Sequence, residues 1–173
     1  MNYFITIILG TGREGANSVK VAEFVFKEAK NYGFELGLIK VKDYLDKPWT
    51  GGMSQEKRNK ASEILNKSNG LIIISPEYNH SFPGELKLFL DEFYEEFAHK
   101  PVGICGVSRG KLGGARMVEQ LRIVLIEFSM ILLRNTVYFS NVENFENEKE
   151  NYQESLKKLF NELKFYCEKL CRN

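Results

Sequence analysis

Apolar residues follow two repeating patterns along this chain. Five short runs are almost continuously apolar and rich in β-branched residues, which is typical of strands buried on both faces of a sheet. These runs are Tyr3–Leu9, Phe34–Val41, Gly70–Ser75, Pro101–Val107 and about Asn135–Phe139. In the segments between and after them, apolar residues recur every three to four positions, which predicts amphipathic helices. The predicted helices are Asn17–Tyr32, Ser54 to about Asn66, Pro83–Phe97, Gly113–Glu127 and Lys149–Leu170.

The spacing also predicts which helix faces are buried. In the first helix, the shared face holds Val21, Ala22, Val25, Phe26 and Ala29. In the third helix, it holds Leu86, Phe89, Leu90 and Phe93. In the closing helix, it holds Leu156, Leu159, Phe160, Leu163, Tyr166 and Leu170. Gly33 directly follows the first helix, at a position where a glycine commonly ends a helix.

Strands and helices that alternate from end to end predict an α/β fold, with a parallel sheet covered by helices on both faces. Right-handed crossovers leave few topologies, and five β/α units fit the flavodoxin-like three-layer sandwich of strand order 2-1-3-4-5. The length of 173 residues is ordinary for one domain, and no linker or repeat interrupts it, so we expect a single domain over residues 1–173. Ligands of such sheets bind beyond the carboxyl ends of the strands. The loops after the first, third and fourth strands are therefore the candidates for chemistry.

Charge and terminal composition exclude several classes of function. The formal net charge is +1 and no basic run is present, which argues against a nucleic-acid partner. The apolar start, Met1–Gly10, lacks a basic leader and has about half the length of a membrane span. We therefore expect a cytoplasmic protein with no membrane partner.

The three cysteines suggest reduced thiols, because the number is low and odd. Cys105 lies in an apolar run and is expected in the core. Cys167 and Cys171 share a helix face, and a metal pair there is conceivable. No further Cys/His cluster completes a metal site, so we expect packed or surface thiols and no metal.

The loop after the first strand, Gly10–Ser18, opens with a match to the dinucleotide fingerprint G-x-G-x-x-G. Asp43 stands about where the ribose-binding acid of that fingerprint falls. However, the helix is expected to start at Asn17 or Ser18, which leaves Gly15 in the loop instead of in the first helical turn. This position of Gly15 counts against the dinucleotide fingerprint, and an NAD-binding module stays the alternative interpretation of this loop.

The same loop carries many polar donors, from Thr11, Arg13, Asn17 and Ser18. A terminal phosphate accepts many such hydrogen bonds, whereas a pyrophosphate approached closely by backbone favours bare glycines. The free N–H groups and the dipole of a helix N-terminus favour an anion in either case. The pattern favours a terminal phosphate over an ordinary turn whose Asn or Ser merely caps the helix.

The other two loops suggest a planar ligand. Ser75–Gly84 contains two prolines and two aromatic residues, so a stiff loop can present its backbone N–H groups to a heterocycle; the alternative is a turn shaped by proline. Gly106–Arg116 is rich in glycine, which permits close approach to a ligand; the alternative is a flexible connection.

Together the three loops resemble the NAD(P)H-dependent FMN reductase family. The resemblance runs from the first strand to about Arg122 and is most specific at Pro-Glu-Tyr-Asn. It rests on Gly10-Thr11-x-Arg13 with Ser18, on Pro76-Glu77-Tyr78-Asn79-His80-Ser81-x-Pro83-Gly84-x-Leu86-Lys87, and on Ser108-x-Gly110-x-x-Gly113-Gly114-x-Arg116 with Gln120-Leu121-Arg122. The family's usual serine three residues after the arginine is Ala16 here, which leaves the register of phosphate ligands open between Asn17 and Ser18.

The resemblance implies a flavodoxin-like FMN-dependent oxidoreductase. In this family a hydride passes from NADPH or NADH to FMN, and the electrons then reduce a flavin, quinone or azo acceptor. The resemblance implies phosphate ligands at Thr11, Arg13, Asn17 and Ser18. It implies flavin-ring contacts at Pro76, Glu77, Tyr78 and Asn79, with Ser108 and Gly110 at the ring's other edge. No side chain is predicted as a catalytic acid or base, since the cofactor carries the redox chemistry.

The resemblance also implies a homodimer or homotetramer, with possible contacts from the aromatic-rich segment Phe89–Phe97 and from Trp49. Core packing and a surface anchor, respectively, are the alternatives for these residues. Besides the NAD-binding module, an FMN electron carrier without NAD(P)H activity stays open. The net charge of +1 disfavours such a carrier, because flavodoxins are usually strongly acidic.

Overall fold

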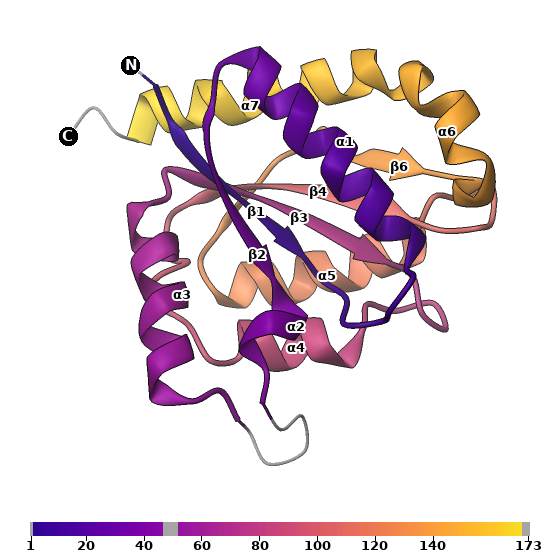
Figure 1. Ribbon diagram of the computed structural model, residues 1–173. Helices are drawn as coiled ribbons and strands as arrows, with labels where there is room; N and C mark the ends of the chain where they lie inside the picture. The colour runs from indigo at the N-terminus through magenta and orange to yellow at the C-terminus, as the bar shows by residue number, and fades with distance from the viewer. Residues whose placement is uncertain (1, 47–51, 171–173) are drawn as a thin grey trace.

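A six-stranded parallel sheet occupies the centre of the molecule (Figure 1). This computed structural model describes residues 2–46 and 52–170. The strand order β2-β1-β3-β4-β5 is the predicted one, and β6 also pairs with β4. The strands are β1 Phe4–Leu9, β2 Glu35–Lys40, β3 Gly70–Pro76, β4 Pro101–Val107, β5 Ile131–Leu132 and β6 Val137–Phe139.

The predicted fifth strand, about Asn135–Phe139, corresponds to β6, and a further short strand that was not predicted, β5, precedes it along the chain. β5 pairs with β4 at Pro101 and Val102, whereas β6 pairs with the other half of β4. Between them, the backbone N–H groups of Arg134 and Asn135 donate to the carboxylate of Glu162, at 2.9 and 2.8 Å. These two N–H groups are therefore used by a helix of the next layer, and this contact separates β5 from β6.

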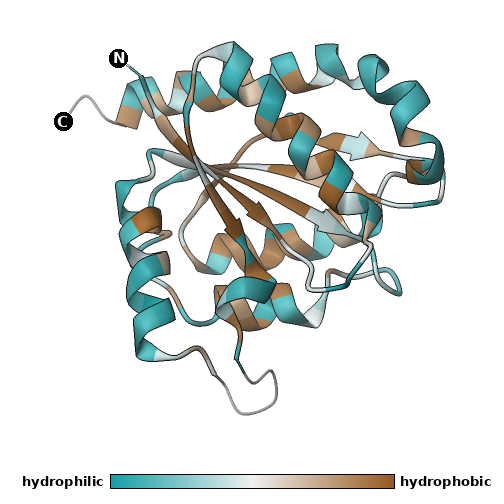
Figure 2. Cartoon of the chain, in the orientation of Figure 1, coloured by the Kyte–Doolittle hydropathy of each residue, from teal (hydrophilic) through white to brown (hydrophobic). Residues whose placement is uncertain are grey.

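Helices cover both faces of the sheet, as predicted (Figure 1). On one face lie α1 (Asn17–Tyr32) and α7 (Gln153–Leu170), and on the other lie α3 (Gln55–Lys67), α4 (Gly84–Leu90) and α5 (Ala115–Glu127). Successive strand residues alternate between the two cores: Ile72 packs toward α1 and α7, and Ile73 toward the opposite helices. Figure 2 shows the strands as the apolar centre and the outer helix faces as hydrophilic.

The predicted buried faces are largely confirmed. In α1, Phe26 is only partly buried; Phe24 is buried instead and meets the ring of Phe145 edge-on, with centroids 5.6 Å apart. In α7, Tyr166 is partly buried and Leu170 is 39% exposed, while the buried residue of the last turns is Cys167. All other residues predicted on these faces are buried.

Several element ends differ from the prediction. The helix expected over Pro83–Phe97 ends at Leu90, yet Phe93 and Phe97 stay buried because the turns after it lie on the same core. The helix expected from Lys149 starts at Gln153. Three short helical segments precede it: η1 Val142–Asn144, α6 Phe145–Glu148 and η2 Lys149–Tyr152.

Backbone requirements account for the other ends. Gly33 ends α1 with a φ of 103°, as predicted. Gly113 and Gly114 have φ values of 58° and 84°, so α5 begins only at Ala115. After β2, the chain turns at once into the short helix α2, Val41–Tyr44. The predictions for Trp49 and Cys171 lie outside the described residues, and the predicted loop Lys47–Met53 lies there in part.

Candidate cofactor-binding site

A cavity of about 340 Å³ lies where the loops after β1, β3 and β4 come together. Its lining residues are Arg13, Glu14, Gly15, Ala16, Asn17, Ser18, Pro76, Glu77, Tyr78, Val107, Ser108, Arg109 and Val142. Seven of the ten residues predicted to bind a cofactor are among them: Arg13, Asn17, Ser18, Pro76, Glu77, Tyr78 and Ser108. The other three, Thr11, Asn79 and Gly110, lie outside this lining. The sheet topology thus brings together loops that are far apart in the sequence.

The start of α1 leaves its polar side chains available to a ligand. The capping position is Ala16, which has no side-chain acceptor, so neither Asn17 nor Ser18 caps the helix as the alternative interpretation of this loop expected. Gly15 lies in the loop with a φ of 67°, as expected. The first N–H groups of a helix have no intrahelical partner, and the helix dipole adds a partial positive charge there. The arrangement attracts an anion.

Ser18 is the most informative residue of this loop. It is 1% exposed, and its Oγ has no hydrogen-bond partner among the described residues. A buried hydroxyl without a partner costs roughly 1–3 kcal/mol. Because Ser18 also lines the cavity, the missing partner is one that a ligand in the cavity can supply.

The two arginines at the cavity differ in their ion pairs. Arg109 pairs with Glu143 at 3.2 Å, whereas Arg13 makes no ion pair with any described residue and its side chain is exposed. Arg13 is therefore the guanidinium free to pair with an anion beside the start of α1. Glu14, which follows it, is also exposed and can turn toward solvent.

Thr11 supports the site without lining the cavity. It is 2% exposed, and its hydroxyl lies 3.0 Å from that of Tyr78 and accepts from the N–H of Arg13 at 3.2 Å. Its Oγ1 also donates to Glu85 at 3.4 Å, and the N–H of Gly12 donates to the same carboxylate oxygen at 2.9 Å. Glu85 was not among the predicted site residues, because nothing in local spacing brings it next to a loop 73 positions away.

A tight hairpin, Tyr78–Ser81, explains the position of Asn79. Tyr78 and Ser81 exchange two backbone hydrogen bonds, at 2.8 and 3.0 Å. Asn79 and His80, at the tip, both have positive φ, 49° and 68°, as a type I′ turn requires. Asn tolerates this conformation, so its presence in the motif has a backbone reason, and its side chain is exposed.

Glu77 divides its roles between backbone and side chain. Its N–H donates to the carbonyl of Val107 at 2.9 Å, which continues the sheet beyond β3. Its carboxylate accepts from the N–H of Met117 at 3.4 Å and lies 3.8 Å from the guanidinium of Arg116. The side chain thus serves the start of α5, whose own capping residue, Gly114, has no acceptor.

The third loop is held close to the sheet by glycines. A Cβ at Gly106 would lie 2.4 Å from the carbonyl oxygen of Gly113, so no side chain fits there. Ser108 donates through its N–H to the carbonyl of Phe139 and through its hydroxyl to the carbonyl of Gly110, both at 3.0 Å. Gly110 is exposed and shapes the turn from outside the cavity.

Comparison with known proteins identifies the family. The model of the NADPH-dependent FMN reductase family matches residues 4–144. The chain belongs to this family. Quinone reductase from Escherichia coli is 33% identical to this family member over 85 residues, which cover 47% of the chain and 45% of that enzyme. NADPH azoreductase from a Bacillus species is 26% identical over 125 residues, covering 70% of the chain and 67% of that enzyme. The chain thus matches just under half the length of the quinone reductase.

Solved structures show the same fold. FerB from Paracoccus denitrificans, described as a flavoenzyme NAD(P)H:(acceptor) oxidoreductase, superimposes with a TM-score of 0.77 at 18% identity and covers 95% of this chain and 98% of its own. The apo NADH:FMN oxidoreductase EMOB gives a TM-score of 0.76 at 23% identity, covering 99% and 92%. The flavodoxin-like sandwich of this FMN reductase family member is therefore secure.

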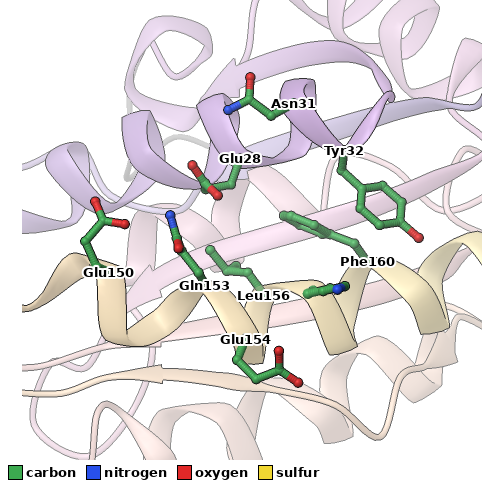
Figure 3. A pocket seen from close by; sticks show the side chains of 9 residues that line it. Glu28, Asn31, Tyr32, Glu150, Gln153, Glu154, Leu156 and Phe160 are labelled. Carbon is green, nitrogen blue, oxygen red and sulfur yellow. The ribbon is translucent and has the colours of Figure 1, made fainter.

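A larger cavity, of about 520 Å³, lies elsewhere in this family member, between α1 and α7 (Figure 3). It lies away from the carboxyl ends of the strands, where ligands of such sheets bind. The lining residues are Glu28, Asn31, Tyr32, Glu150, Gln153, Glu154, Leu156, Lys157 and Phe160. These groups are mainly acidic and amide side chains above an apolar floor, so the smaller cavity is the better candidate for a cofactor that carries a phosphate.

Metal, thiol and membrane features add no second site. Among residues 2–46 and 52–170, no group of three or more His, Cys, Asp or Glu side chains is arranged to hold a metal ion. Cys105 is a buried free thiol, and burial raises its pKa far above the usual range, so it stays protonated. None of the helices in the described part of the chain is both long and apolar enough to cross a bilayer.

Proposed function

We propose that this chain is an FMN-dependent oxidoreductase that takes a hydride from NADPH or NADH and reduces a quinone, flavin or azo acceptor. The observation that carries the proposal is Ser18: a buried hydroxyl in a cavity at a helix N-terminus, beside Arg13, where neither side chain has a partner among the residues that the structure describes. That set of groups fits a terminal phosphate. The names of the relatives, quinone reductase and azoreductase, supply the classes of acceptor.

In this proposal the residues divide by the part of FMN they hold. Arg13, Asn17 and Ser18 bind the phosphate, with the N–H groups at the start of α1. Thr11 supports them by fixing the loop and the hydroxyl of Tyr78. Pro76, Glu77 and Tyr78 would hold the ring on one side, in a loop shaped by the turn at Asn79. Ser108 would line its other edge, where Gly110 shapes the turn from outside the cavity.

The bound cofactor would supply the hydride and electron chemistry, and the chain supplies position and shelter. Pro76 and Tyr78 give a stiff wall that keeps a flat ring in place, and the glycine-rich loop admits it closely to the backbone. No side chain is assigned as acid or base. His80 is exposed at the hairpin tip, and the hydroxyl of Tyr78 is bonded to Thr11.

The absorption spectrum of the purified protein tests the proposal. We expect a flavin band, retained or restored on adding FMN, and oxidation of NADPH or NADH that depends on a quinone, flavin or azo dye. A colourless protein that fails to bind added FMN would overturn the proposal. Binding of NAD without FMN would favour the dinucleotide module instead.

An FMN electron carrier is the second candidate. A flavodoxin from Pseudomonas aeruginosa shares the fold with a TM-score of 0.66 at 15% identity, which concerns the fold alone. The net charge of +1 argues against a carrier, because acidic surfaces are usual in flavodoxins. Flavin binding without any turnover of NADPH or NADH would favour this second function.

We also propose that residues 1–173 form one FMN-binding domain that assembles as a homodimer or homotetramer in the cytoplasm. The buried free thiol of Cys105 fits a reducing compartment. The exposed apolar residues Tyr94, Ile123 and Ile126 support assembly, at 48%, 72% and 62% exposure. Ile123 and Ile126 lie on the outer face of α5, which a second copy would cover.

A further inference from the structure

Glu85 joins two of the three loops at the cavity although it does not line the cavity. It lies in the first turn of α4, after the β3–α4 loop. Its Oε1 accepts from the N–H of Gly12 at 2.9 Å and from the hydroxyl of Thr11 at 3.4 Å. The hydroxyl of Thr11 in turn lies 3.0 Å from that of Tyr78, whose ring belongs to the cavity wall.

The direction of the bond between Thr11 and Glu85 follows from the chemistry of a carboxylate. An ionised carboxylate only accepts, so in this 3.4 Å contact the Thr11 hydroxyl is the donor. The Thr11 oxygen has two lone pairs, and one accepts from the N–H of Arg13 at 3.2 Å. In the 3.0 Å contact between Thr11 and Tyr78, either hydroxyl can be the donor. Thr11 is then fully satisfied, as its burial demands.

We infer that Glu85 is a positioning residue of the flavin site, an inference that rests on the function proposed above. It fixes the β1–α1 loop against α4 and, through Thr11, holds the hydroxyl of Tyr78 at the cavity wall. One consequence follows. The backbone N–H groups of Gly12 and Arg13 are used within the protein, so the backbone N–H groups that meet the phosphate are those from Gly15 onward, beside the guanidinium of Arg13.

The experiment compares Glu85→Ala, Glu85→Gln and the control Asp91→Ala; within the described part of the chain, the carboxylate of Asp91 pairs with the exposed Lys87 alone. The dissociation constants of FMN and riboflavin are measured from the quenching of flavin fluorescence. We expect Glu85→Ala to weaken FMN binding about tenfold, the loss of one charge-assisted hydrogen bond. The affinity for riboflavin, which lacks the phosphate, should fall less. Glu85→Gln should recover most of the affinity, because its amide oxygen still accepts from Gly12.

A measurement without flavin separates this inference from the proposed function. The exchange rate of the Gly12 amide hydrogen, followed by NMR in the ligand-free protein, should rise in Glu85→Ala and stay unchanged in Asp91→Ala. If the wild type binds no FMN, the proposed function fails while the exchange rates still report on Glu85. Wild-type FMN affinity together with wild-type exchange at Gly12 in Glu85→Ala would overturn the positioning role.

Discussion

Two buried serines show at the scale of single residues how a binding site differs from a packed interior. Ser68 is 3% exposed, and its hydroxyl is bonded to Thr6 and to the carbonyl of Ile64. Ser18 is as deeply buried but has no partner among the described residues. A protein interior normally satisfies its polar groups, so an exception at a cavity indicates a ligand.

Replacement of these serines by alanine should therefore have opposite effects. Ser18→Ala removes an unsatisfied group, so the free energy of unfolding of the flavin-free protein should stay level or rise by up to about 1 kcal/mol. FMN affinity should fall about tenfold, with riboflavin affinity nearly unchanged, since the lost bond is to the phosphate. Chemical denaturation and fluorescence titration measure the two quantities.

Ser68→Ala is the matched control. It breaks satisfied hydrogen bonds, so stability should fall by about 1 kcal/mol while FMN affinity stays the same. A Ser18→Ala variant that loses stability like Ser68→Ala and keeps its preference for FMN over riboflavin would show that Ser18 is only a structural residue.

His80 offers a second test at this scale. It adopts a φ of 68° at the tip of the Tyr78–Ser81 hairpin, where glycine is the favoured residue of a type I′ turn. A left-handed conformation costs a non-glycine residue roughly 1 kcal/mol. His80→Gly should therefore raise the unfolding free energy by roughly several tenths of a kcal/mol or more. His80→Val should lower it, because a β-branched residue resists this conformation. Equal stability of both variants would contradict the argument.

Sequence patterns identified most of the residues at the site but not all of their contacts. Arg13, Asn17 and Ser18 all belong to the predicted loop Gly10–Ser18, so their gathering at one cavity could be foreseen from the topology. The partnership of Glu85 with Gly12 could not, because it depends on the angle at which α4 leaves its loop. Thr11 belongs to the same contact, and its hydroxyl faces that network.

At the scale of elements, local signals fixed some boundaries and tertiary packing fixed others. α1 was predicted at both ends, since its amphipathic pattern and Gly33 agree. The segment after α4 was predicted as helix because Phe93 and Phe97 continue the apolar spacing. Turns can bury the same aromatic rings, and the spacing does not distinguish the two. The split between β5 and β6 depends on Glu162, a side chain of a distant helix.

The contact between β4 and the loop before α5 gives a test of an element boundary. A Cβ at Gly106 would collide with the backbone of Gly113, so Gly106→Ala should lower the unfolding free energy by roughly 1–3 kcal/mol and weaken FMN binding. Gly84→Ala is the control: apart from its chain neighbours and the backbone of its own helix, no atom of the described residues lies within 4 Å of its Cβ position, and alanine favours helix. Its stability should stay level or rise in denaturation experiments. A small loss of stability in Gly106→Ala would contradict the close approach between Gly106 and the backbone of Gly113.

Lys100 links the end of α3 to the start of β4 and predicts a dependence on pH. Its ammonium donates to the carbonyl of Leu65, and burial lowers its pKa, an effect partly offset by Glu96. In the folded state the proton is therefore lost below the ordinary pKa of 10.5. The unfolded state then binds more protons, so stability should increase as pH rises toward 10.5.

The variant Lys100→Met isolates this effect. As pH rises toward 10.5, the unfolding free energy of the wild type should increase relative to that of the variant, as the linkage relation requires. Denaturant titrations over a series of pH values up to this one measure the difference. If the difference in unfolding free energy between the wild type and Lys100→Met stays constant with pH, the pKa of Lys100 is not lowered in the folded state.

At the scale of the whole molecule, the outer face of α5 differs from the other exposed helix faces. Ile123 and Ile126 are 72% and 62% exposed there, and the same face carries Arg116 near its start and Glu127 at its end. Two copies of α5 packed antiparallel would bring Arg116 of each next to Glu127 of the other, over the isoleucines. The net charge of +1 adds little repulsion between copies. This face is self-complementary in both charge and apolar surface.

The face also adjoins the cofactor site, because Gln120 of α5 accepts from the hydroxyl of Ser81 in the hairpin at 3.2 Å. If a second copy covers α5, Ile123→Arg should halve the mass measured by light scattering, since a charge would be buried at the interface. Phe165→Arg is the matched control: it changes an aromatic residue that is 51% exposed on α7, on the opposite face of the sheet, and should leave the mass unchanged. A loss of flavin affinity in the Ile123→Arg monomer alone would show that the interface steadies the hairpin at the site. An unchanged mass in Ile123→Arg, or a monomer produced by Phe165→Arg, would place the interface elsewhere.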